Sequence, residues 1–179
     1  MPRIMNAEVR WVKCDPKNPV RNYNEDGYEW SLMLLTNDPA TAKSWADEHH
    51  LTVKRKKPKE GEKATGDEPF VTYLRKLAYR DDEGKDACRP APSCVAADLS
   101  PLNPNIVGNG SLANIQVRYR EWSYKKKSGV TADLIGIQVI DLHPYVPVEE
   151  EFEATEMKVT ERARGDDGND EDDDDDSVY

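Results

Sequence analysis

The sequence predicts a mainly β domain with one inserted helix, followed by a disordered acidic tail. Three observations lead to this prediction. Most apolar segments are short and alternate with polar residues, and turn-forming residues separate them, as in half-buried strands. Only one segment combines helical spacing with a helix start signal. Residues 149–179 carry 15 acidic and 3 basic residues, whereas residues 1–148 carry 20 acidic and 22 basic residues.

The charge distribution divides the chain into a domain at residues 1–148 and a tail at residues 149–179. The tail has few apolar side chains to bury and its charges repel one another, so we expect it to be disordered. Its acidic run consists of Asp172, Asp173, Asp174, Asp175 and Asp176. The chain then ends in Val178 and Tyr179, and an aromatic end is not needed for solubility. This pattern favours a tail that binds a basic surface.

Strands are expected at residues 7–14, 28–36, 70–80, 93–99, 111–124 and 131–142, with a hairpin turn at Asp81–Asp86. Asp38 followed by Pro39 predicts the start of a helix over residues 40–50. Ala42, Trp45, Ala46 and His49 share one face of that helix. Strands do not alternate with long helices, which argues against a doubly wound parallel sheet. A β-sandwich or a small barrel remains.

Several protein classes are excluded by the composition. No run of about 18 apolar residues exists, so no membrane span is predicted. The N-terminal residues lack an apolar segment, and no signal peptide is expected. The three cysteines, Cys14, Cys88 and Cys94, are too few and too scattered for a disulfide scaffold. Their number favours a reducing compartment.

No constellation of catalytic residues is recognisable in the sequence. There is no nucleophile elbow, no phosphate-binding glycine loop before a helix and no metalloprotease motif. Cys88 and Cys94 have no nearby histidine or further cysteine, so they do not form a zinc site. We therefore predict a protein that is not an enzyme and that needs no metal or cofactor.

The strand over residues 111–124 is the most informative segment, because successive side chains of a strand point to opposite faces. One face is apolar and is expected in the core: Ala113, Ile115, Val117 and Tyr119. The other face carries Asn114, Gln116, Arg118, Arg120, Trp122 and Tyr124. Cations bind phosphates and flat aromatic rings stack on unpaired bases. This face therefore predicts a binding surface for single-stranded nucleic acid.

Two lysine-rich loops and two further strands supply additional candidate contacts. The predicted contacts are Arg118, Arg120, Trp122, Tyr124, Lys125, Lys126, Lys127, Trp30, Tyr28, Tyr73, Arg75, Lys54, Arg55, Lys56 and Lys57. Tyr28 and Trp30 can be buried as easily as exposed, and either face of the strand at residues 70–80 can be core. Trp11 shares a strand face with Ala7, Val9 and Lys13 and is expected in the core.

The order of these features resembles a known family. Gly27-Tyr28-Glu29-Trp30 leads into the helix start, Gly108-Asn109-Gly110-Ser111 opens the long strand, and Trp122-Ser123-Tyr124 ends it. With the acidic tail ending in Tyr179, this order resembles the single-stranded DNA-binding proteins of T-odd and related tailed phages.

The resemblance implies a five-stranded OB-fold barrel with one helix inserted after the second strand. It implies a protein that coats single-stranded DNA in phage replication and recombination, in the cytoplasm of the bacterial host. The tail would mimic DNA in the basic groove and recruit polymerase and helicase. A homodimer is implied by the family alone.

Three alternatives to this function remain open at the level of sequence. The first is an acidic-tailed interaction or inhibitor protein that binds basic partners and no DNA. The second is a small nuclease built on a β-barrel, although the sequence contains no recognisable set of catalytic residues for it. The third is a barrel that binds RNA, because OB-folds bind both nucleic acids.

Overall fold

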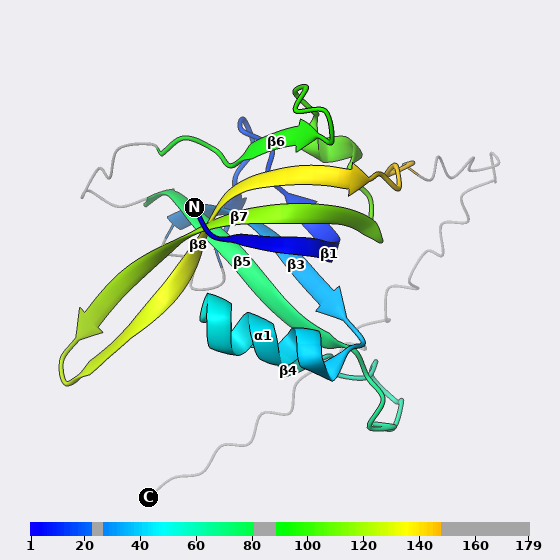
Figure 1. Ribbon diagram of the computed structural model, residues 1–179, viewed down its shortest axis with the longest axis vertical. Helices are drawn as coiled ribbons and strands as arrows, with labels where there is room; N and C mark the ends of the chain where they lie inside the picture. The colour runs from blue at the N-terminus through cyan, green and yellow to red at the C-terminus, as the bar shows by residue number, and fades with distance from the viewer. Residues whose placement is uncertain (23–26, 81–88, 148–179) are drawn as a thin grey trace, which may run out of the picture. The chain divides into compact units, whose positions relative to one another are not determined.

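The computed structural model describes residues 1–22, 27–80 and 89–147 (Figure 1). Five strands form its barrel: β1 (Arg3–Lys13), β3 (Gly27–Thr36), β5 (Phe70–Arg80), β7 (Ser111–Tyr124) and β8 (Lys127–Asp141). They close in the order β1–β3–β5–β8–β7–β1, and only the β5–β8 pairing is parallel. This arrangement is a five-stranded OB-fold barrel, as the sequence resemblance predicts. A β-sandwich is excluded.

Short elements extend the barrel. β2 (Val20–Arg21) pairs with β3, β4 (Lys54–Arg55) with β5, and β6 (Ser93–Ala96) runs parallel to β8. A short 3₁₀ helix, η1 (Pro104–Ile106), precedes β7. β8 begins at Lys127 rather than at residue 131, because Lys125 and Lys126 alone form the turn after β7. The predicted turn at residues 81–86 lies outside the described residues.

The paired ends of β7 and β8 extend beyond the other barrel strands as a two-stranded arm (Figure 1). Tyr124 pairs with Lys127 at its tip. Lys125, the first turn residue, has φ 55°, a left-handed conformation that a two-residue hairpin turn demands and that lysine adopts less readily than glycine or asparagine. The arm therefore presents three consecutive lysines at its tip.

Alternating apolar residues fill the barrel. Leu34, Leu74, Ile115 and Leu134 come from four different strands and are completely buried. Burying such a side chain contributes roughly 1.5–3 kcal/mol to the free energy of unfolding. On β5 the core face is therefore the one that carries Leu74 and Ala78, which settles the orientation that the sequence leaves open.

The helix α1 (Pro39–His49) begins where the sequence predicts. The carboxylate of Asp38 accepts the backbone N–H groups of Ala40 and Thr41 at 3.1 and 3.0 Å, which satisfies donors that the first helical turn leaves free. Trp45 is buried, whereas Ala46 is exposed, contrary to the face assigned from its spacing. In the described part of the chain no helix is long and apolar enough to cross a membrane.

The C-terminal end of α1 is attached to β7. The hydroxyl of Tyr119 donates to the carbonyl oxygen of Glu48 at 3.0 Å and lies 3.0 Å from Nδ1 of His49. Partial burial lowers the pKa of His49, because a desolvated imidazole is harder to protonate. Tyr119 is thus half-buried under the helix end, while its neighbours Arg118 and Arg120 are exposed.

Candidate nucleic-acid interface

One residue from each barrel strand lies in a continuous row across the outside of the barrel. The strand registers pair Lys13 with Ser31, Ser31 with Arg75, Arg75 with Asp133, and Asp133 with Arg118. None of these five side chains is buried. We call this row the belt. It brings residues far apart in the sequence next to one another around the outside of the barrel, and it carries three cations and one carboxylate.

Two arginines of this surface have acidic partners. Arg120, next to the belt on β7, forms two bonds with the Asp133 carboxylate, with Nε 2.9 Å from Oδ2 and Nη2 3.3 Å from Oδ1. This pairing raises the pKa of Arg120. Nε of Arg75 lies 3.6 Å from Oε1 of Glu29. The acidic partners hold the guanidinium groups in place and reduce their net charge.

Arg118 and Lys13 have no acidic partner within 4.0 Å among the residues the structure describes. The nearby Lys76 has a lowered pKa, first because of partial burial and then because of the charges of Arg118 and Arg89, which Asp133 opposes. These cations make the β5–β7 part of the belt a region of concentrated positive charge, where a phosphate would be stabilised.

Trp122 is held on the arm as a flat platform. It pairs with Gly129 across the hairpin, and a Cβ at Gly129 would lie only 2.9 Å from Cζ2 of the indole. The ring thus rests on the glycine backbone and is still 40% exposed. Tyr124, two residues on, is 67% exposed and has the Lys125 ammonium 5.2 Å from its ring centroid. Both aromatics lie on the same face as Arg118 and Arg120, as the alternation predicts.

A second aromatic–cationic region lies on β5 and β4. Tyr73 is 55% exposed, and the Arg75 guanidinium lies 5.8 Å from its ring centroid. A groove of about 430 Å³ is lined by Thr52, Lys54, Val71, Tyr73 and Arg75. Because Arg75 also belongs to the belt, this groove adjoins it directly. The structure therefore joins the predicted residues of β5 and β4 to those of β7.

The lysine loop after β4 is only partly tied to the barrel. Arg55 stacks on Phe70, with its guanidinium 4.4 Å from the ring centroid, and donates through Nη1 to the carbonyl oxygen of Glu68 at 2.9 Å. Lys56 and Lys57 are exposed. Lys54 lines the groove, whereas Lys56 and Lys57 do not, and Arg55 has a structural role.

Trp30, a predicted DNA contact whose burial the sequence leaves open, lies in the core. Trp30 is 1% exposed and its indole N–H donates to the carbonyl oxygen of Asp15 at 2.8 Å, so it belongs to the core and is not available for stacking. It shares the inward face of β3 with Leu32 and Leu34, which are also buried. Tyr28 is half-buried against the same core, with Arg21 5.4 Å from its ring centroid.

Trp11 was expected in the core and is instead 61% exposed. A β-bulge between Arg10 and Lys13 adds one residue to β1, so the Trp11 side chain points to the outer face of the sheet instead of the core. No feature of the local sequence signals this bulge. Trp11 is therefore a surface aromatic that the sequence alone does not identify.

The described cysteines and acids do not form a reactive centre. Cys14 is buried and its thiol pKa is raised to about 12, while half-buried Cys94 has a thiol pKa of about 11, in both cases mainly through burial. Such thiols are poor nucleophiles at neutral pH. Within residues 1–22, 27–80 and 89–147 no group of three or more His, Cys, Asp or Glu side chains is arranged to hold a metal ion. Cys88 and the tail residues 172–176 and 179 lie outside these ranges.

The chain matches no protein-family model and no curated protein sequence. Among solved structures, it is similar to the single-stranded DNA-binding protein of bacteriophage Enc34. The C-terminally truncated form gives a TM-score of 0.51 at 17% identity, over 80% of this chain and 87% of that chain. The same protein in complex with ssDNA gives 0.51 at 16% identity, over 80% and 88%. The single-stranded DNA-binding protein gp2.5 of bacteriophage T7 gives 0.44 at 15% identity, over 84% and 94%.

At these identities the Enc34 structures establish a shared fold. The chain has the OB-type barrel of a phage single-stranded DNA-binding protein, and the resemblance seen in the sequence is confirmed at the level of the fold.

Proposed function

We propose that this protein binds single-stranded DNA with little sequence preference, along the belt and the face of Trp122. The observation that carries the proposal is the combination of outward cations with a partly exposed indole supported from behind by Gly129. A ring already held flat loses little conformational freedom when a base stacks on it, and stacking contributes about 1–3 kcal/mol per base.

The position of these groups on the barrel supports the proposal. OB-folds bind oligonucleotides on the face of their second and third strands and with the loop between the fourth and fifth. Here β3 and β5 are the second and third barrel strands, and the arm is the connection between the fourth and fifth. Tyr73 and Arg75 lie on β5, and Trp122 and Tyr124 lie on the arm. The Enc34 protein, which has the same fold, has been solved in complex with ssDNA.

We further propose that the acidic tail competes with DNA. Residues 149–179 have a net charge of −12, and the domain that precedes them has a net charge of +2. The run of Asp172–Asp176 offers a row of anions to a surface suited to phosphates. Because the tail is tethered to the domain, its competition is intramolecular and occurs at a high effective concentration. DNA would displace it and release it for a partner.

The biological setting follows from the proposed activity. A protein that coats single-stranded DNA and exposes an acidic, aromatic-ended tail is suited to phage replication and recombination in the host cytoplasm. Polymerase and helicase are the partners we propose for the tail. We also propose a homodimer, the oligomeric state that the sequence resemblance implies.

Tryptophan fluorescence tests the DNA proposal directly. Of the four tryptophans, Trp30 and Trp45 are 1% and 3% exposed, so stacking can quench only Trp11 and Trp122. A thymine oligonucleotide should quench emission in low salt and less in high salt, and duplex DNA should have little effect. The same titration with a uracil ribo-oligonucleotide compares DNA with RNA. Absence of any response, also after removal of the tail, would refute DNA binding and favour a protein that binds basic partners.

A further inference from the structure

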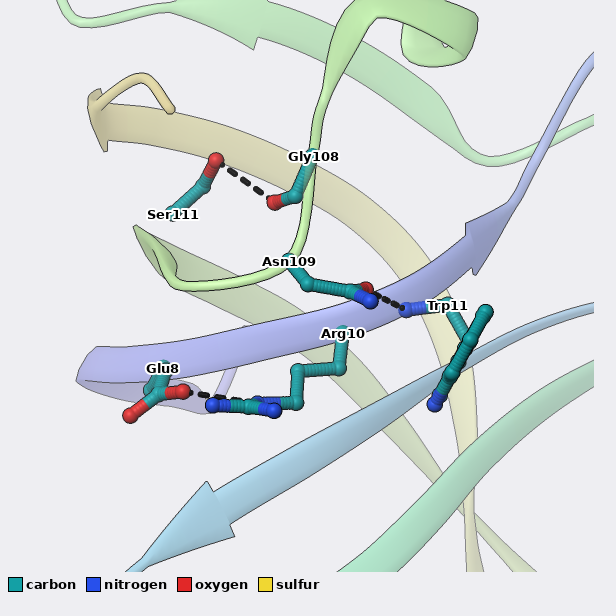
Figure 2. A network of polar contacts seen from close by, with 6 residues as sticks. All are labelled: Glu8, Arg10, Trp11, Gly108, Asn109 and Ser111. Carbon is teal, nitrogen blue, oxygen red and sulfur yellow. Dashed lines mark hydrogen bonds and ion pairs between the residues drawn. The ribbon is translucent and has the colours of Figure 1, made fainter. Parts of the chain in front are cut away.

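The exposed indole of Trp11 lies on a strained segment of β1. Trp11 has φ 51°, in the left-handed region that only glycine adopts without penalty. Its backbone N–H donates to Oδ1 of Asn109 at 2.8 Å, which stabilises the bulge from the neighbouring loop (Figure 2). A large aromatic residue at a strained and exposed position stabilises the fold very little. Such positions are often retained for function.

A second loop completes the surroundings of Trp11. Gly108 donates to the carbonyl oxygen of His143 at 2.8 Å, and a Cβ at Gly108 would lie 2.5 Å from that oxygen, so only glycine permits this approach. Ser111, which is buried, donates through Oγ to the carbonyl oxygen of Gly108 at 2.8 Å (Figure 2). These contacts hold the segment that ends in Tyr145 beside the Asn109 loop. Tyr145 is exposed.

Together these elements form a groove of about 340 Å³, which is lined by Trp11, Val12, Lys13, Asn105, Asn109 and Tyr145, among others. It offers two aromatic side chains and one lysine. It also offers the Asn109 side-chain amide, whose Nδ2 has no hydrogen-bond partner in the described part of the chain. Stacking surfaces, a cation and a free amide donor match the face, the phosphate and the edge of an unpaired nucleotide.

The groove adjoins the belt. Lys13, which lines the groove, is the β1 member of the belt; it pairs with Ser31, which pairs with Arg75 on β5. A strand of DNA that crosses the belt from the arm is thus led by Arg75 and Lys13 to Trp11. Charge and continuity therefore indicate a nucleic acid rather than a protein segment as the occupant.

We propose that the Trp11 groove binds a nucleotide of the same DNA strand that contacts Trp122, at the opposite end of the belt. This inference rests on the proposed DNA-binding function and adds a second stacking site, which lengthens the DNA segment covered by one protein. The occupant is a base of single-stranded DNA, stacked on Trp11, with its phosphate near Lys13.

The first test isolates the emission of Trp11. In a Trp122→Phe variant, Trp11 is the only exposed tryptophan, since Trp30 and Trp45 are buried. A fluorescein-labelled thymine oligonucleotide of about 20 nucleotides exceeds the usual site of one OB-fold and reports binding by its anisotropy. Quenching of tryptophan emission in parallel with the anisotropy rise supports the proposal. An anisotropy rise without quenching overturns the groove and leaves the DNA-binding function intact. No anisotropy rise with the wild-type protein overturns both.

The second test separates binding from stability. Trp11→Gly removes the ring and places glycine at a φ that suits it, so we expect an unchanged Tm and a loss of about tenfold in affinity. Ile140→Ala, at another exposed apolar residue of the barrel, is the matched control and should retain full affinity. Wild-type affinity in Trp11→Gly would overturn the proposal. A change in the sedimentation mass of Trp11→Gly with unchanged affinity would also overturn it and would assign the groove to contacts between copies of the chain.

Discussion

Asp133 is the one carboxylate of the belt, and its removal gives the sharpest test of that surface. Asp133→Asn keeps the size of the side chain and removes its charge. Arg120 loses its two-bond partner at 2.9 and 3.3 Å and becomes available to a phosphate. The Asp133 and Arg120 side chains are 24% and 57% exposed, and an ion pair so accessible to solvent contributes at most about 1 kcal/mol to stability. The barrel should therefore remain folded.

The expected gain in affinity follows from counterion release. Each phosphate contact of a single strand changes the logarithm of the binding constant by about −0.7 per decade of salt. One additional contact from Arg120 therefore raises the affinity about eightfold at about 0.05 M salt and less than about twofold at about 0.5 M. The slope of the salt dependence should become steeper by about 0.7.

Fluorescence anisotropy of a labelled thymine oligonucleotide, measured across this salt range, gives both quantities. Asp141→Asn is the matched control, because it removes the same charge from the same strand at a residue outside the belt. It should change the affinity only slightly. Equal effects of the two variants would mean that net charge alone matters. A weaker affinity of Asp133→Asn would mean that Asp133 positions Arg120 for DNA; either result refutes the reasoning.

Three further predictions concern the tail, the arm and the helix. Deletion of residues 165–179 should tighten DNA binding at low salt, and an unchanged affinity in the anisotropy assay would contradict mimicry by the tail. Gly129→Ala should displace the Trp122 ring, whose Cζ2 would lie 2.9 Å from the new Cβ, and weaken binding up to about tenfold without lowering the Tm. Equal affinity would show that the platform is not needed. The pKa of His49 is lower in the folded state than in the unfolded chain, so stability is complete above the unfolded value near 6.5 and falls as the pH drops below it. The urea midpoint should decrease from about pH 7.5 to about pH 5.5, and less so in His49→Gln; parallel pH curves would contradict this assignment.

The sequence alone identifies the local structure and one face of the site. The alternation in residues 111–124 places Arg118, Arg120, Trp122 and Tyr124 outside the barrel, because the strand pleat has a period of two. Asp38 and Pro39 locate the start of α1, because helix capping depends on neighbouring residues only. The bounds of β5 and β7 are also local properties and agree with the expectation.

The tertiary structure decides which distant residues meet. The belt joins Lys13, Ser31, Arg75, Asp133 and Arg118 through four strand registers, and three of these join strands that no short turn connects, so local sequence does not fix them. β1 has two bulges, one between Ile4 and Ala7 and one between Arg10 and Lys13, and long-range contacts accompany both. The backbone N–H groups of Asn6 and Trp11 donate to the side chains of Asn114 and Asn109, which lie 108 and 98 positions further along the chain. A single inserted residue reverses the face of a side chain, and its cause lies in long-range contacts. For this reason Trp11, predicted as core from its neighbours, is a surface residue of the folded protein.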